Sequence, residues 1–153
     1  MNGNVEVHVR NCFGCDPSNP IGLKVQFAVN EDCVTGEFTS TDDHVGPPGI
    51  VHGGVIAAIM DEALSFLCRS LLNYDVRTVR EEITFRSSST IGERIRVEAR
   101  LERDKSRAVV ATAKVCSGRG TIAEAKGTLL KVRDAFSGMH VKEVAGNGKT
   151  ETR

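Results

Sequence analysis

The segment GIVHGGVIAAIMDEAL, residues 49–64, sets a histidine and two glycines before an apolar run that ends near two carboxylates. A helix start carries backbone N–H groups without intrahelical partners, at the positive end of the helix dipole. Because Gly53 and Gly54 have no side chains, a carbonyl oxygen could approach these donors directly and be stabilised as an oxyanion. Asp61 then supplies a carboxylate that can act as a general base or as a nucleophile. This combination indicates hydrolysis of an ester-like bond.

Asp61, and not its neighbour Glu62, shares a helix face with the glycines. Residues spaced by four, three and four positions lie on that face, namely Gly54, Ala58, Asp61 and Ser65. All but the aspartate are small, which leaves room beside the carboxylate for a ligand or another chain. Glu62 points about 100° away. The competing interpretation is the solvated stripe of an amphipathic helix, made of Asp61, Glu62, Ser65 and Arg69.

The spacing of the two groups predicts a second chain. Along a helix, the seven residues from Gly54 to Asp61 correspond to about 10.5 Å. One chain could therefore not hold both groups on a single reacting carbon. If donor and carboxylate act together, two chains must supply them across a symmetric interface, so the sequence predicts a homodimer.

The rest of the sequence predicts the elements that position this segment. A proline-free stretch from Gly53 to about Leu72 predicts one long helix. Alternating apolar and polar residues predict two strands before it, near 25–29 and 34–38, and four after it, near 78–85, 94–102, 109–115 and 121–132. Glu81 interrupts the alternation of the first of these four. Because turns join strands antiparallel, we expect an α+β fold with about six strands wrapped around one central helix.

Composition and charge narrow the function further. The 153 residues suit a single domain, 1–153, with an N-terminal loop over 1–21 and a polar tail over 134–153 that we expect to be mobile. A formal net charge of zero argues against nucleic acid binding through bulk positive charge. The longest apolar run is far shorter than the roughly 20 residues that span a bilayer, and no secretory signal is visible. We expect a cytoplasmic protein without nucleic acid or membrane partners.

Five cysteines lie at positions 12, 15, 33, 68 and 116. Their odd number favours free thiols over a disulfide framework. Cys12 and Cys15 form a CxxC motif, but a zinc site would need two further ligands, and there is no second CxxC or HxxxH motif. The favoured interpretation is a turn-rich loop, and a half-site completed by another subunit is the alternative.

These residues together resemble the hot-dog-fold acyl-CoA thioesterases. The motif HGG at 52–54, with an acid nine positions after the histidine on the one long helix, is similar to the PaaI-like subgroup of the phenylacetate pathway. The phrase CFGCDPSNPIGL, residues 12–23, also looks like members of this group. The likeness covers roughly residues 10–133. It implies hydrolysis of acyl- or aryl-acyl-CoA to free acid and CoA by a homodimer that assembles into a homotetramer, with no metal and no cofactor beyond the CoA of the substrate.

The resemblance also implies roles for individual residues. Asp61 matches the catalytic carboxylate, and Gly53, with Gly54 beside it, matches the backbone N–H that polarises the thioester carbonyl. His52 matches the histidine that shapes this turn, and Thr78 falls where relatives place a hydroxyl that orients the attacking water. Residues expected to contact CoA are Phe85, Arg103, Lys105, Ser106 and Arg107. The basic side chains in this turn suit the phosphates of CoA, and a solvated hairpin tip is the other interpretation.

Two positions depart from the family pattern, and two other functions stay open. Gly46 stands where some relatives have an asparagine bonded to the histidine, and Arg86 with Ser87–Ser89 replaces the usual proline after the aromatic residue of the strand.

A non-catalytic acyl-CoA sensor on the same fold is the alternative function, although the chain leaves no space for an output domain. A hydratase would need an Asp–His pair, and no histidine follows Asp61 before His140.

Overall fold

The computed structural model describes residues 5–132 and 139–143 of the chain. In chain order the elements are β1 (Val5–Val9), β2 (Gln26–Val29), β3 (Cys33–Thr39), a short 3₁₀ helix (Asp42–His44), α1 (Gly53–Leu71), β4 (Asp75–Phe85), β5 (Arg94–Asp104), β6 (Ala108–Ser117), β7 (Gly120–Val132) and β8 (Met139–Glu143). The predicted helix and all six predicted strands are present, with boundaries that differ by a few residues.

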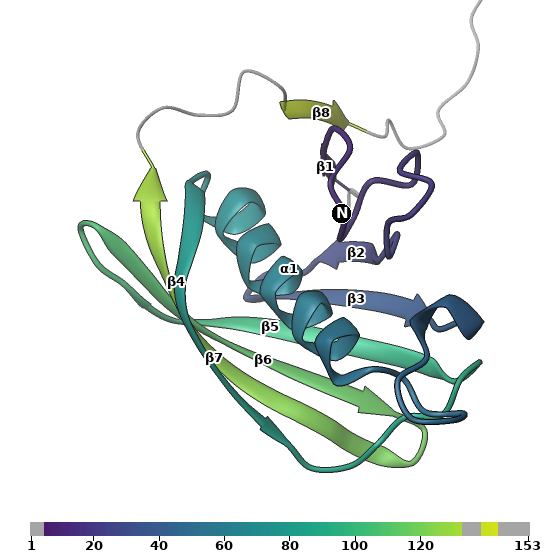
Figure 1. The fold of residues 1–153 in the computed structure, drawn as a ribbon. Helices are drawn as coiled ribbons and strands as arrows, with labels where there is room; N and C mark the ends of the chain where they lie inside the picture. The colour runs from purple at the N-terminus through teal and green to yellow at the C-terminus, as the bar shows by residue number, and fades with distance from the viewer. Residues whose placement is uncertain (1–4, 133–138, 144–153) are drawn as a thin grey trace, which may run out of the picture.

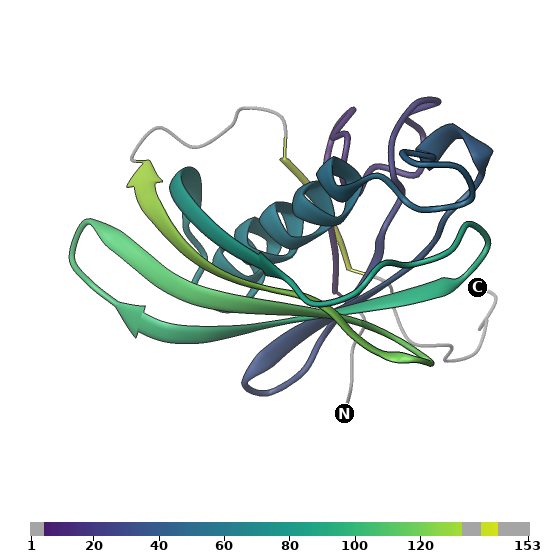
Figure 2. The same ribbon diagram turned by 60° about the horizontal axis from the view of Figure 1, so that its bottom comes forward.

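Strands β2 to β7 form one antiparallel sheet in the order β2-β3-β5-β6-β7-β4. The sheet curls around α1, which lies along its concave face (Figures 1 and 2). This confirms the expected α+β architecture and the hot-dog arrangement that the resemblance implies. No helix among the described residues is long and apolar enough to cross a lipid bilayer.

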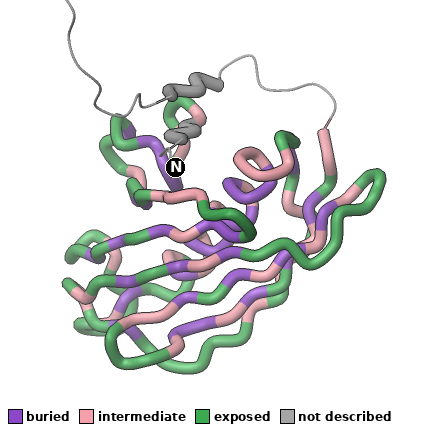
Figure 3. Tube along the Cα trace, turned by 180° about the vertical axis from the view of Figure 1, so that it is seen from behind, coloured by how far each residue is buried: buried purple, intermediate pink, exposed green. Residues whose placement is uncertain are grey.

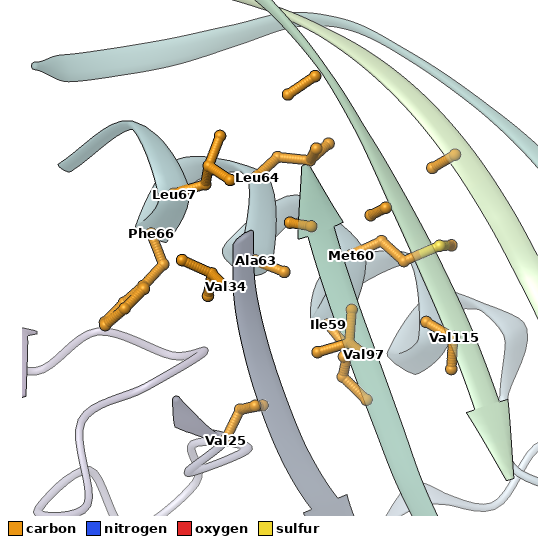
Figure 4. Close-up of a cluster of buried hydrophobic side chains, with 14 of the residues drawn as sticks. Val25, Val34, Ile59, Met60, Ala63, Leu64, Phe66, Leu67, Val97 and Val115 are labelled. Atoms are coloured by element: carbon orange, nitrogen blue, oxygen red, sulfur yellow. The ribbon is translucent and has the colours of Figure 1, made fainter. Parts of the chain in front are cut away.

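The core lies between α1 and the inner face of the sheet. The largest side chains that the helix buries are Ile59, Met60, Leu64, Phe66 and Leu67, each exposed by 1% or less. They pack among alternate residues of the strands, as the close-up in Figure 4 shows. From behind, buried and exposed residues alternate along the strands of the sheet (Figure 3). This period of two is what the sequence predicted for a sheet with one solvated face.

One glycine allows the helix to approach the sheet closely. A Cβ atom at Gly127 of β7 would lie 2.6 Å from the Leu64 Cδ1 atom, closer than packed carbon atoms can come. The absence of a side chain at Gly127 therefore lets the middle of α1 rest on β7.

The two ends of the chain contain strands that the sequence did not predict. Residues Val5–Val9, within the predicted N-terminal loop, form β1, and Met139–Glu143, within the predicted tail, form β8. The two strands pair antiparallel as a separate two-stranded sheet. No local sequence pattern indicates this pairing, because it joins short segments more than a hundred residues apart. Residues 134–138 and 144–153, the remainder of that tail, lie outside the described residues.

Candidate active site

His52 determines how α1 begins. The chain enters through a turn in which Ile50 N–H donates to Pro47 O over 2.9 Å, with Gly49 at a positive φ of 73° that suits glycine. His52 is then the N-cap, and its Nδ1 accepts a hydrogen bond from Gly54 N–H at 2.8 Å. The predicted role of this histidine in shaping the turn corresponds to this cap.

The two glycines after the cap have different surroundings. The Gly54 N–H, which the sequence suggested as an oxyanion donor, is already bonded to His52, and a Cβ at Gly54 would lie 2.9 Å from that Nδ1 atom. The Gly53 N–H has no hydrogen-bond acceptor among the described residues. A Cβ at Gly53 would meet the ring of Phe85 at 3.6 Å, so this half-exposed ring stands beside the free donor. The geometry leaves Gly53 as the donor of the pair.

Asp61 and Thr78 form the centre of the site. The Thr78 Oγ1 hydroxyl donates to Asp61 Oδ1 over 2.6 Å, joining the middle of α1 to β4. Both residues are half-buried. The sequence named both as site residues, and the fold brings them together across 17 positions of the chain. Thr78 Oγ1 keeps its lone pairs for a further donor, such as a water molecule.

A β-bulge in β4 brings a third residue, Glu81, to this face. The pairing of β4 with β7 shifts between Thr78 and Arg80, which leaves Val79 without a partner and 55% exposed. Beyond the bulge the alternation changes phase, so Thr78 and Glu81 both face the helix instead of opposite sides. Glu81 was not among the site residues predicted from the sequence, although its place in an otherwise apolar alternation was a signal.

Glu81 is a second carboxylate near Asp61. Burial, and then the charge of Asp61, raise its pKa from 4.5 to about 7. Its Oε1 atom is buried and has no hydrogen-bond partner among the described residues. Near neutral pH this group therefore changes between a neutral acid and an anion beside Asp61.

The residues expected to contact CoA do not gather in one place within a single chain. Ala108, next to the turn at 105–107, pairs with Leu130 of β7, whereas Phe85 pairs with Ala123 near the other end of the same strand. The turn thus lies at the end of the sheet far from Gly53 and Phe85. It links β5 to β6, with Lys105 N–H bonded to Ala108 O over 2.9 Å. Arg103 precedes the turn and pairs with Glu102 at 3.4 Å. The turn lies on the surface of the chain, and its contact with CoA stays a prediction.

Gly46, one of the departures from the family pattern, lies against the cap. A Cβ at Gly46 would be 3.0 Å from the His52 Cα atom. Gly46 N–H also donates to Ile50 O at 2.8 Å, which closes the loop before α1. His52 N–H donates to His44 O at 2.9 Å, so backbone contacts hold His52 in this chain.

Glu62 has a different environment from Asp61. Its Oε1 accepts from Arg69 Nη2 at 2.6 Å, and its Oε2 accepts from the Cys12 thiol at 3.3 Å. Cys15 lies beside Cys12; the hydrogen bond between them lowers the pKa of the Cys12 thiol to about 7, and together with burial raises that of Cys15. These partners occupy both carboxylate oxygens of Glu62. This is consistent with the prediction that Asp61, and not Glu62, is the site carboxylate.

A cleft of about 1140 Å³ lies beside the start of α1. Its walls include Phe13 and Ile21 from the N-terminal loop, Phe38 from β3, and Val55 from the first turn of the helix. The same walls also carry the charged side chains Lys24, Glu37, Asp43 and Arg94, so the cleft, which is partly open to solvent, is of mixed polarity.

A comparison with protein-family models matches the part of the chain that holds Gly53, Asp61 and Thr78. A family model described as the thioesterase superfamily matches residues 48–124, half of the chain. A Ralstonia eutropha protein, described as a candidate thioesterase related to phenylacetic acid degradation, has 20% identity and a TM-score of 0.68 over 76% of this chain and 92% of that one. No protein with a curated function matches significantly.

Two similar streptococcal structures contain a CoA ligand. A hypothetical thioesterase from Streptococcus pneumoniae, solved with coenzyme A, has 14% identity and a TM-score of 0.66 over 70% of this chain and 87% of that one. A Streptococcus mutans protein bound to acetyl CoA has 20% identity and a TM-score of 0.65 over 71% and 88%. At such identities the likeness concerns the fold.

Proposed function

The chain belongs to the thioesterase superfamily, and we propose that it hydrolyses acyl- or aryl-acyl-CoA thioesters to the free acid and CoA. The observation that carries the proposal is the 2.6 Å hydrogen bond between Thr78 and Asp61, on the helix whose start leaves the Gly53 N–H free. The CoA ligands of the streptococcal neighbours support CoA as the thiol carrier.

In the proposed reaction, Asp61 acts as the general base for a water molecule. The Thr78 hydroxyl donates to Asp61 Oδ1 and accepts from the same water, which fixes its direction of attack. As the water oxygen bonds to the thioester carbon, negative charge moves to the carbonyl oxygen, where the Gly53 N–H stabilises it. The C–S bond then breaks, CoA leaves as the thiolate, and the proton taken by Asp61 returns to the sulfur. These steps use no metal and no further cofactor.

The same geometry supports a homodimer. The eight residues from Gly53 to Asp61 span about 12 Å of helix, too far for both to contact one thioester. Strand β4 is an edge strand of 11 residues that pairs with β7 on one side only. An unpaired edge of this length is a template for another strand, so we propose that β4 pairs with its copy in a second chain, each site taking Gly53 from one chain and Asp61 from the other.

Position 53 offers a variant that removes only the proposed donor. Proline is accepted at the first residue of a helix and lacks an N–H. His52 already has the extended ψ of 133° that precedes proline readily. We expect Gly53→Pro to lower kcat by about 100-fold to 1,000-fold on a panel of acyl-CoA and aryl-acyl-CoA esters, scored by release of free CoA thiol. Gly53→Ala keeps the N–H and adds a Cβ at ordinary contact with Phe85, so it is the matched control.

Mixing two inactive variants tests the shared site. In heterodimers of Gly53→Pro with Asp61→Asn, one site carries both defects and the other carries neither. Random pairing should restore about a quarter of the wild-type rate. No recovery in verified heterodimers would contradict a site shared between chains. Saturable CoA-ester binding by the wild-type chain without turnover on the panel would refute hydrolysis and favour the acyl-CoA sensor.

A further inference from the structure

Two thiols and a carboxylate converge on a side of α1 that the proposed reaction does not use. Cys12 and Cys15 come from the N-terminal loop, and Glu62 comes from the helix. One sulfur or oxygen atom of each lies within 4.8 Å of the other two. In tetrahedral zinc coordination, a sulfur and an oxygen ligand lie about 3.5 Å apart. The Cys12 Sγ and Glu62 Oε2 atoms are 3.3 Å apart, which matches this separation.

Arg69 orients the carboxylate for such a role. Its Nη2 bonds to Glu62 Oε1 at 2.6 Å, which leaves Oε2 directed at the thiols. Carboxylates that bind metals are commonly held by a second hydrogen bond of this kind. The Arg69 and Glu62 side chains are only 10% and 13% exposed. The net charge of the occupied site would be zero, from two thiolates, one carboxylate, one guanidinium and one divalent cation. A neutral site is favourable where the groups are largely buried from solvent.

The loop that carries the cysteines is already folded around Glu62. A Cβ at Gly14 would lie 2.4 Å from the Glu62 Cγ atom, so only glycine lets the loop pass this close to the helix. The backbone bonds of the loop include Asp16 N–H to Cys12 O at 3.2 Å and Val25 N–H to Gly14 O at 2.9 Å. The ligand atoms are therefore positioned by the fold before any ion arrives.

We propose that Cys12, Cys15 and Glu62 bind one Zn²⁺ ion, which fastens the N-terminal loop to helix α1. Zn–S bonds form to both sulfurs as their thiol protons pass to solvent, and one oxygen of Glu62 supplies the third ligand. Cys12 is half-exposed, so water takes the fourth position. Phe13, between the two cysteines, lines the cleft beside the helix start, and the ion would thereby hold one wall of that cleft.

Metal content tests this site without reference to activity. The full chain, purified in the presence of a reductant from zinc-supplemented medium, should contain about one zinc per chain. Co²⁺ added to the metal-free chain should produce a thiolate-to-cobalt charge-transfer band. Cys12→Ser should lose both signals; because Cys12 is half-exposed, this variant should keep its fold, as circular dichroism would verify. Cys116→Ser removes a half-exposed cysteine outside the cluster and should keep both signals.

A further variant distinguishes the residues that bind the ion from Arg69, which only orients Glu62. Arg69→Met should weaken zinc affinity by about 10-fold to 100-fold while retaining the cobalt band at saturating metal. The proposal is overturned if the reduced wild-type chain binds neither ion, or if Cys12→Ser binds zinc as the wild type does. A Cys12–Cys15 disulfide in the unreduced chain, together with no metal uptake after reduction, would also overturn it and identify the pair as a redox couple.

Discussion

Replacing Glu81 with glutamine removes the titrating group beside Asp61 and should change how stability depends on pH. In the folded chain the pKa of Glu81 is about 7, against an ordinary value of 4.5. Between pH 4.5 and pH 7 the unfolded chain has released this proton while the folded chain retains it. Stability must therefore fall as pH rises through this window and become level above it. Below pH 4.5 both states hold the proton, and the contribution disappears.

The size of the effect follows from the same two values. A tenfold change in proton affinity is worth about 1.4 kcal/mol, so the change from 4.5 to about 7 means that ionising Glu81 in the folded chain costs at most about 3.5 kcal/mol. Glu81 is only half-buried, and solvent screening reduces this to about 1–2 kcal/mol. Because glutamine does not ionise, Glu81→Gln should be more stable than the wild type by that amount at pH 8 and nearly equal to it at pH 5. For a chain of this length, the melting temperature at pH 8 should rise by about 2–8 °C.

Urea unfolding at pH 5, 6, 7 and 8, at fixed protein concentration, measures this difference. Titrating groups other than Asp61, whose charge acts on Glu81, have the same surroundings in both chains, so they cancel when wild type and variant are compared. Glu82→Gln is the matched control, because Glu82 is exposed and its pair with Arg80 is solvated; it should change stability by less than about 1 kcal/mol at every pH. If the difference between wild type and Glu81→Gln is the same at pH 5 and pH 8, Glu81 does not keep its proton in the folded chain.

Three further changes test the site and its supports. Thr78→Val removes the hydrogen bond to Asp61 and should lower kcat/KM by about 10-fold to 100-fold, the worth of a bond to a charged group; an unchanged rate in steady-state assays would argue against an orienting role. Gly127→Ala brings a Cβ to within 2.6 Å of the tip of the Leu64 side chain and should cost about 1–3 kcal/mol in urea unfolding if that fully buried side chain cannot shift, and equal stability would show that it can. Lys105→Glu should raise KM for acyl-CoA without lowering kcat if the turn contacts the CoA phosphates, whereas equal KM values would identify a solvated tip.

The sequence predicts the main sheet and helix well because one periodic signal dominates each element. The alternation along β5 and the long proline-free run of α1 each have a single interpretation. The strands β1 and β8 are short and far apart in the chain, and their pairing depends on contacts that no local pattern encodes.

The site could be predicted only in part, because local patterns reveal neighbours in the sequence but not contacts between distant segments. His52, Gly53 and Asp61 lie within one segment, so their arrangement follows from helix geometry. Thr78 could be named only through the family resemblance, and Glu81 was missed, because strict alternation puts these two on opposite faces of a strand. The cluster of Cys12, Cys15 and Glu62 was missed as well, since its third member is separated from the CxxC motif by about fifty residues.

The bulge at Val79 also has a consequence for length variation in this family. Val79 is the unpaired extra residue, so its deletion would leave Thr78 and Glu81 on the face that meets the helix and would make β4 regular. Homologous chains can therefore differ by one residue at this point and still keep both side chains beside the carboxylate at the position of Asp61. An alignment that places a gap here preserves the correspondence of the site, whereas an ungapped alignment assigns Glu81 to a residue on the outer face.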